Sequence, residues 1–307
     1  MLLVVGLVVG LVALASRWTR APEPVAQPVC RAEVPAPDDG GVLRAEFSPE
    51  RTANAALVVG MADRRGLPAR AATIGIATAI QESGLVNIDY GDRDSLGLFQ
   101  QRPSQGWGTE EQVQDPVYAT GAFYDALVEI DGYTELEITD AAQQVQRSGF
   151  PEAYADHEGE GRALASSLYG LSPATLVCEL PPLERAGGEQ PADAAAADMV
   201  SALQTWATEG WQASAVEAGA PAEGEEADPS SAATVVLDAA GAAEPGRTAW
   251  ALAHSAVALA ERHRVVRVEV DGRVWDRGEA EAGWSVVETG EGGAPAAGDG
   301  RVRVTTG

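Results

Sequence analysis

Glu82 stands where the sequence predicts the end of an apolar helix. Pro68 predicts the start of that helix, Ile74 and Ile80 belong to its apolar stripe, and Gly84 predicts its stop. The carbonyl end of a helix carries partial negative charge, so a carboxylate is disfavoured there. That charge and the apolar neighbours both raise the pKa of a carboxyl group, as a general acid requires. The alternative is a side chain that points into water, and for an isolated Glu we would favour it.

A second motif follows Glu82 at a fixed distance and reverses that preference. Ser83-Gly84-Leu85 comes directly after Glu82, and Ser95 to Gln100 reads Ser-Leu-Gly-Leu-Phe-Gln beyond a polar loop. Gly97 stands fifteen residues after Glu82 and Gln100 eighteen. Glycine allows a close approach of the backbone to a ligand, and a glutamine side chain offers both a donor and an acceptor. The two halves at this spacing are much more specific than either half alone.

These residues together resemble the central signature of the lysozyme-like superfamily, specifically the soluble lytic transglycosylases and goose-type lysozymes. The run over 89–108 is also similar to exported actinobacterial cell-wall proteins of this kind, and the resemblance covers residues 30–178, about half of the chain. It implies a mainly α-helical lysozyme-like domain. It also implies cleavage of the glycan strand of peptidoglycan, at the β-1,4 bond after N-acetylmuramic acid, with no cofactor.

The resemblance implies that Glu82 protonates the leaving glycosidic oxygen and then acts as a base. In a lytic transglycosylase the muramic acid O6 hydroxyl attacks and leaves a 1,6-anhydro end, whereas in a hydrolase water attacks. Ordinary glycosidases use two carboxylates, so a second one decides the outcome. Asp92 and Asp94 are the candidates, although turn formation and loop solvation are the more common roles of such residues.

The same resemblance places substrate contacts in the segment after Glu82. Gly97 and Gln100 are expected to bind the sugar, and Gln101 and Tyr90 are weaker candidates for lining the cleft. The family usually carries an Ala-Tyr-Asn-Ala-Gly-like motif further on, which this chain lacks; residues 143–148 and Tyr154 occupy that place. This departure leaves the product chemistry open. It also leaves open a non-catalytic wall-binding or assembly protein on the same scaffold.

The sequence predicts no metal site. Asp89, Asp92 and Asp94 loosely match a calcium loop but lack the Gly and the distal Glu of an EF-hand. The histidines do not form an HExxH motif, so a zinc peptidase is unsupported.

The two cysteines bracket a stretch of domain size. Cys30 follows a Pro-rich segment and Cys178 precedes Pro181-Pro182. In an oxidising compartment such a pair most simply closes a disulfide. A reactive cysteine is the rival interpretation, but neither residue has a helix-start or CxxC context. We therefore predict a Cys30–Cys178 disulfide.

The N-terminal segment indicates export. Residues 1–16 carry no charged side chain and are dominated by Leu, Val and Gly, which predicts a signal peptide or a membrane anchor. Residues 17–41 contain repeated prolines and predict a tether. The protein is expected in the cell envelope, membrane-anchored or secreted, with peptidoglycan as its partner and membrane contact only if the segment is not cleaved.

Composition excludes one class of function. The chain has 307 residues with 46 acidic and 21 basic side chains, for a net charge of -25, and every basic residue is Arg. Nucleic-acid binding needs a basic face, so that class is excluded. With 45% hydrophobic residues the chain can still build substantial cores.

Length and pattern predict an α+β protein with two domains. The lysozyme-like domain is expected over 42–178, a linker over 179–197 and a small α/β domain of unknown function over 198–307. In the second domain, Asp271-Gly272 between alternating valines predicts a β-hairpin. Trp275 and Trp284 could stack on a sugar, but tryptophans of a hairpin more often pack in the core of a small domain, and we favour that role. The first domain is expected to form helices that start at Pro49, Pro68, Pro116, Thr139 and Pro151; the second, helices over 198–212 and 247–263 and strands at 234–237, 284–286 and 302–304.

Overall fold

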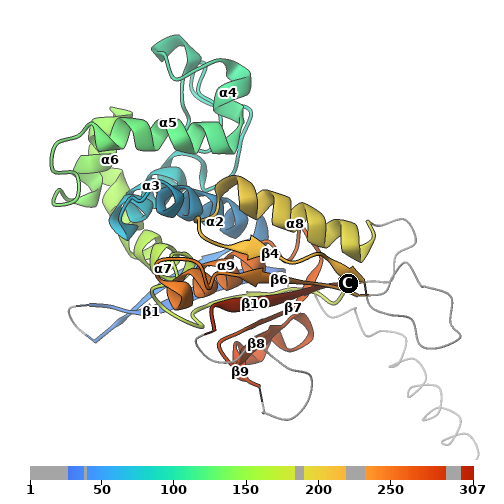
Figure 1. Ribbon diagram of the computed structural model, residues 1–307. Coiled ribbons are helices and arrows are strands. Elements are labelled where there is room, and N and C mark those ends of the chain that lie inside the picture. Colours follow the sequence, from blue (N-terminus) through green and yellow to red (C-terminus); the bar gives the residue numbers. More distant parts are fainter. Residues whose placement is uncertain (1–26, 38–39, 184–189, 219–231, 288–298) are drawn as a thin grey trace, which may run out of the picture.

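The computed structural model describes residues 27–37, 40–183, 190–218, 232–287 and 299–307, and the fold is α+β as the sequence predicted (Figure 1). The predicted signal or anchor at 1–16 lies outside these residues, as does an acidic insertion at 219–231. Within the described ranges, no helix has both the length and the apolar character needed to span a membrane.

The first half of the chain is mainly helical, and its helices begin close to where capping residues predicted them. Ser48 caps the helix that follows, and its Oγ accepts a hydrogen bond from the Arg51 amide. Asp115 accepts a hydrogen bond from the Val117 amide in the same way. Pro151 begins a 3-10 helix rather than an α-helix. The helices are α2 (Pro49–Arg64), α3 (Ala69–Ser83), α4 (Glu110–Gln114), α5 (Pro116–Val128), α6 (Ile138–Gln146) and α7 (Glu158–Leu168), with 3-10 turns η1 (Pro103–Gln105) and η2 (Pro151–His157).

A three-stranded antiparallel sheet corrects the expected tether and domain start. Strand β1 (Val29–Pro35) lies between β2 (Val42–Phe47) and β3 (Leu176–Glu179), so the folded part begins before residue 42. Cys30, Ala32 and Val34 are buried and alternate with more exposed residues along β1. The prolines around this strand obscured its two-residue period in the sequence.

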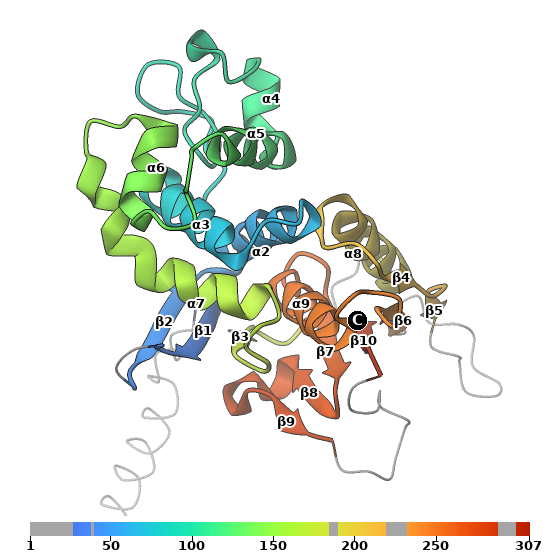
Figure 2. The same cartoon turned by 60° about the vertical axis from the view of Figure 1, so that its left-hand side comes forward.

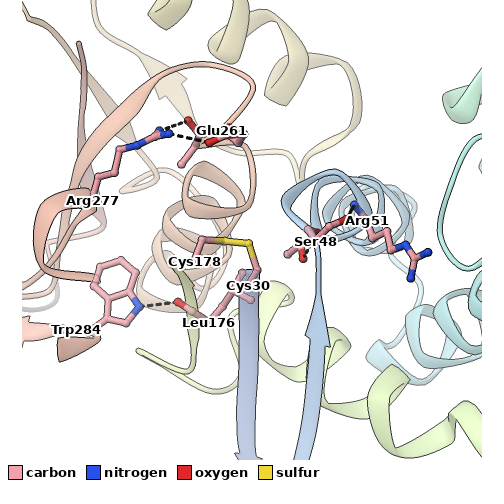
Figure 3. The surroundings of a disulfide bond; sticks show 10 residues. Cys30, Ser48, Arg51, Leu176, Cys178, Glu261, Arg277 and Trp284 are labelled. Atoms are coloured by element: carbon pink, nitrogen blue, oxygen red, sulfur yellow. Dashed lines mark hydrogen bonds and ion pairs between the residues drawn. A yellow bond between two sulfur atoms is a disulfide. The ribbon is translucent and has the colours of Figure 1, made fainter. Parts of the chain in front are cut away.

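The predicted disulfide is confirmed. Cys30 on β1 lies directly opposite Cys178 on β3, and the bond joins residues 148 positions apart (Figure 3). Beside it, Arg31 pairs with Glu46 at 2.9 Å and also with Glu179. The bond therefore fixes the first strand to the strand that leads into the second half of the chain.

The second half forms a larger antiparallel sheet with two helices. Its strand order is β4-β6-β10-β7-β8-β9, and β5 pairs with β6. The predicted hairpin joins β7 to β8 through Asp271 and Gly272, both at positive φ (51° and 70°), which suits a two-residue turn. The elements of the second half are α8 (Ala192–Trp206), β4 (Gln212–Ala213), β5 (Glu217–Ala218), β6 (Ala233–Asp238), α9 (Pro245–Ala258), β7 (Val265–Val270), β8 (Arg273–Asp276), η3 (Arg277–Ala282), β9 (Ser285–Val286) and β10 (Arg301–Thr306). Helix α8 thus begins before the expected residue 198 and α9 ends before residue 263.

The two halves share a continuous hydrophobic core. Figure 2 shows α9 beside α7 and α2, on the side of α2 opposite to α4, α5 and α6. Arg247 of α9 holds the buried Asp63 carboxylate of α2 through two contacts of 3.0 and 3.2 Å. Trp284 donates its indole N–H to the Leu176 carbonyl at 2.8 Å (Figure 3), and it is buried as the hairpin-core interpretation expected. The second half is therefore packed against the first instead of being joined to it only by a linker.

The connection between the halves is also shorter than the expected linker over 179–197. Strand β3 continues to Glu179 and helix α8 already starts at Ala192. His254 on α9 bridges the same boundary, because its buried Nδ1 donates to the Ser167 carbonyl of α7 at 2.7 Å. His254 therefore has a packing role at this boundary.

Candidate functional site

Glu82 lies at the end of α3, on the wall of an open cleft. Helix α3 stops at Gly84, which adopts the left-handed conformation that its sequence position predicted (φ 65°). Behind Glu82, Ile74 and Ile76 are fully buried in the core. The first compartment of the cleft has a volume of about 410 Å³ and is lined by Glu82, Asp92, Ser95, Gln100, Arg102, Gln105, Trp107, Gln146, Arg147, Ser148, Gly149 and Phe150.

The carboxylate of Glu82 is held by one tyrosine. Tyr154 on η2 donates its hydroxyl to Glu82 Oε1 at 2.6 Å. Removal from water raises the pKa of Glu82, and hydrogen bonds from Tyr154 and Gln146 partly oppose that rise. The result is a carboxyl group whose pKa lies above its usual value and whose position is fixed, as proton transfer to a bound ligand requires.

The two candidate second carboxylates have different environments. Asp94 accepts hydrogen bonds from Arg102 Nε at 2.8 Å and from the Ser104 amide at 2.7 Å. These Ser104 and Arg102 contacts hold the pKa of Asp94 well below its usual range. Asp94 therefore fastens its loop and does not line the cleft. Asp92 does line the cleft, but its side chain is 89% exposed.

Three of the expected substrate contacts lie elsewhere. Gly97 (φ 78°) packs on α4, where an added Cβ would lie 2.2 Å from the Val113 carbonyl oxygen, so its lack of a side chain serves chain packing. Gln101 is 1% exposed and donates to the Ala119 carbonyl at 3.0 Å. Tyr90 is 69% exposed and is not part of the cleft lining. Among the substrate-binding candidates, the structure leaves Gln100 in the cleft with Glu82.

The chain segment after α6 supplies the wall that sequence motifs left undefined. Gln146 closes α6 and donates its side-chain amide to the Phe99 carbonyl at 2.8 Å, which ties this wall to the Gly97–Gln100 motif. Phe150 remains 76% exposed at the cleft. The only sign of this wall in the sequence was that residues 143–148 and Tyr154 follow the Gly97–Gln100 motif, where the downstream motif was expected. Their pairing across the cleft depends on how α6 and η2 fold back over α3.

A second compartment continues the cleft toward the end of α5. It has a volume of about 1190 Å³ and shares Gln105, Trp107, Gln146 and Arg147 with the first compartment. The far end is lined by Glu129, Ile130 and Asp131. The two compartments form one groove long enough to hold more of a ligand than the part beside Glu82.

Among the residues described by the structure, no group of three or more His, Cys, Asp or Glu side chains is arranged to hold a metal ion. Comparison of the chain with protein-family models finds no match, and comparison with curated proteins finds none either.

Tyr154→Phe is expected to raise the pKa of Glu82 by about one unit, because it removes a hydrogen bond that favours the ionised carboxylate. NMR titration of the Glu82 side-chain carboxyl, compared with the unmodified protein, measures this shift. Tyr133→Phe, outside both compartments, is the matched control. An unchanged or lower pKa in the Tyr154 variant would show that its hydroxyl does not stabilise the charged form.

Proposed function

We propose that this protein cleaves the glycan strand of peptidoglycan, as a lytic transglycosylase or muramidase, with Glu82 as the general acid and base. The observation that carries the proposal is the half-buried Glu82 carboxyl in an open groove, with a raised pKa and a hydrogen bond from Tyr154. The spacing of Glu82 and Gln100, and the presence of both in one compartment, supports the same assignment.

The reaction begins when protonated Glu82 gives its proton to the glycosidic oxygen. The bond between that oxygen and the muramic acid C1 breaks, and the ionised Glu82 is left beside an electron-poor C1. Glu82 then accepts a proton from the attacking hydroxyl as the new C1–O bond forms, which restores its starting state. If the O6 hydroxyl of the same sugar attacks, the product is a 1,6-anhydro end.

The environment of the other carboxylates favours this intramolecular route within the proposal. Asp94 is occupied by Arg102 and Ser104, and Asp92 is almost fully solvated. A two-carboxylate hydrolase needs a second carboxylate held firmly at the scissile bond, either to activate water or to attack C1. Recycling of one proton through Glu82 needs no such partner, so we propose 1,6-anhydro ends as the main product.

We place this activity in the cell envelope, as a secreted or membrane-anchored protein. The disulfide is compatible with export. With a net charge of -25, the protein would not be drawn to the anionic polymers of a cell wall. A segment that holds the cleft beside the wall at high effective concentration would replace that attraction.

The test is digestion of purified peptidoglycan by the full chain, followed by mass analysis of the soluble fragments. Anhydro-muramic ends support the transglycosylase, and reducing ends indicate hydrolysis by the same cleft. If the protein binds peptidoglycan but does not cleave the glycan, it is a wall-binding or assembly protein and not an enzyme. A protein that neither binds nor cleaves peptidoglycan would contradict the proposal.

A further inference from the structure

Arg147 lies where the two compartments of the groove meet, and its guanidinium has no ion-pair partner among the described residues. It lines both compartments, together with Gln105, Trp107 and Gln146. Most arginines of this acidic chain pair with a carboxylate, as Arg102 does with Asp94. Within the part of the chain that the structure describes, the Arg147 guanidinium forms no ion pair or hydrogen bond, and its side chain is exposed.

The backbone holds Arg147 in place at some cost. Arg147 ends α6 in the left-handed conformation (φ 52°, ψ 42°), where its amide donates to the Gln143 carbonyl at 2.8 Å. Glycine or asparagine adopts this conformation more readily than a long side chain does. Strained positions of this kind are common at functional sites. The arginine therefore stands where local backbone preference would not select it.

The carboxylates of the groove do not neutralise Arg147. Glu82 accepts a hydrogen bond from Tyr154. Asp92 is exposed to solvent, and its carboxylate lies 3.9 Å from the Arg93 guanidinium. Glu129 and Asp131 line the second compartment without an ion pair to Arg147. The other side chains that Arg147 shares between the compartments are two amides and an indole. A ligand that crosses this junction consequently meets one positive charge among neutral groups.

We propose that Arg147 binds a carboxylate carried by the muramoyl part of the substrate. A guanidinium matches a carboxylate through two parallel N–H donors, which gives geometric selectivity as well as attraction. The inference depends on the proposed glycan-cleaving function and specifies which glycan the groove selects. The carboxylate can be the lactyl group of a muramic acid without peptide or an acid group of an attached stem peptide. A polymer of N-acetylglucosamine alone carries neither.

The experiment compares soluble oligosaccharides of equal length in three forms: muramic-acid-containing without peptide, the same with stem peptides, and N-acetylglucosamine only. Dissociation constants are measured by calorimetry on the full chain carrying Glu82→Gln, so that the ligands survive. Adding Arg147→Gln is expected to weaken binding of a carboxylate-bearing ligand about 10- to 100-fold and to leave the N-acetylglucosamine oligomer within about twofold. Arg273→Gln is the matched control, because it removes another exposed arginine that lies outside both compartments and has no ion pair among the described residues.

The outcomes separate the two carboxylate sources. A loss with the peptide-free oligomer assigns the lactyl group, and a loss only with the peptide-bearing oligomer assigns the peptide. Arg147→Lys should recover part of the affinity, because it restores the charge without the planar pair of donors. If Arg147→Gln does not fold, Arg147→Asn is used instead, since asparagine tolerates the left-handed backbone.

Two results would overturn the inference. One is that Arg147→Gln changes the dissociation constants of all three ligands by the same factor, or changes none of them. The other is the same loss in the Arg273→Gln control. Either of these with binding intact rejects the role of Arg147 and leaves the glycan-cleaving function standing. Failure of all three oligosaccharides to bind before Arg147 is changed rejects both together.

Discussion

Glu82→Gln is expected to lower the rate of glycan cleavage by about 10²- to 10⁴-fold, the usual contribution of a positioned general acid or base. Glutamine has nearly the same shape, and its side-chain oxygen can still accept the Tyr154 hydroxyl. It cannot release a proton to the glycosidic oxygen. The change therefore removes the chemistry while it preserves the packing.

Initial rates of anhydro-muropeptide release, together with the thermal midpoint, measure this effect. The midpoint is expected to stay the same or rise slightly, because burial no longer opposes a charged form. Glu160→Gln, which alters a carboxylate on α7 that contacts His157 and does not line the groove, should leave the rate unchanged. Asp92→Asn should cost less than about 10-fold if the single-carboxylate route operates. A Glu82→Gln protein with nearly full activity would exclude Glu82 as the acid.

Replacing both Cys30 and Cys178 by alanine is expected to cost about 4 kcal/mol of unfolding free energy. The bond closes a loop over a sequence separation of 148, and a loop of that length restricts the unfolded chain strongly. Loss of the bond removes this restriction and lets the unfolded ensemble expand, which lowers the free energy of unfolding. Urea unfolding, with and without a reducing agent, measures the loss.

The reducing agent provides the internal control for this prediction. It should destabilise the natural protein by a similar amount and have no effect on the double alanine variant, since the described cysteines are all in the one disulfide. Reduction that leaves the urea midpoint of the natural protein unchanged would show that the bond contributes no net stability. A much larger loss in the alanine variant than on reduction would assign the excess to packing around the sulfur atoms.

Local signals predicted the helices well where capping residues mark their ends. Ser48-Pro49 and Asp115-Pro116 both begin helices, and Gly84 ends α3 at the predicted position. These motifs act through hydrogen bonds and backbone angles within a few residues, so no knowledge of distant contacts is required. The Asp271-Gly272 hairpin belongs to the same class, because its turn depends on two adjacent positive φ angles.

Strands and domain limits were less accessible. The sequence predicted a tether up to residue 41, whereas β1 forms inside it because β2 and β3 lie on either side and exchange backbone hydrogen bonds with it. The sequence also predicted a linker and a separate second domain, whereas the two halves share one core. This core likewise depends on contacts between residues that are far apart in the sequence. Arg247 and the buried Asp63 carboxylate are far apart in sequence and meet only when α2 and α9 pack together.

For the candidate site, the sequence alone determined that Glu82 ends an apolar helix, that Gln100 follows it eighteen residues later, and that two cysteines bracket the region. Each of these depends on residue type and short-range spacing. Only the tertiary structure decided which side chains surround Glu82. It brought Tyr154 and Arg147 to the groove and turned Gly97 and Gln101 into packing residues. The physical reason is that burial and hydrogen-bond partners, which set the pKa of a carboxylate and the exposure of a cation, are properties of packed elements and not of the chain order.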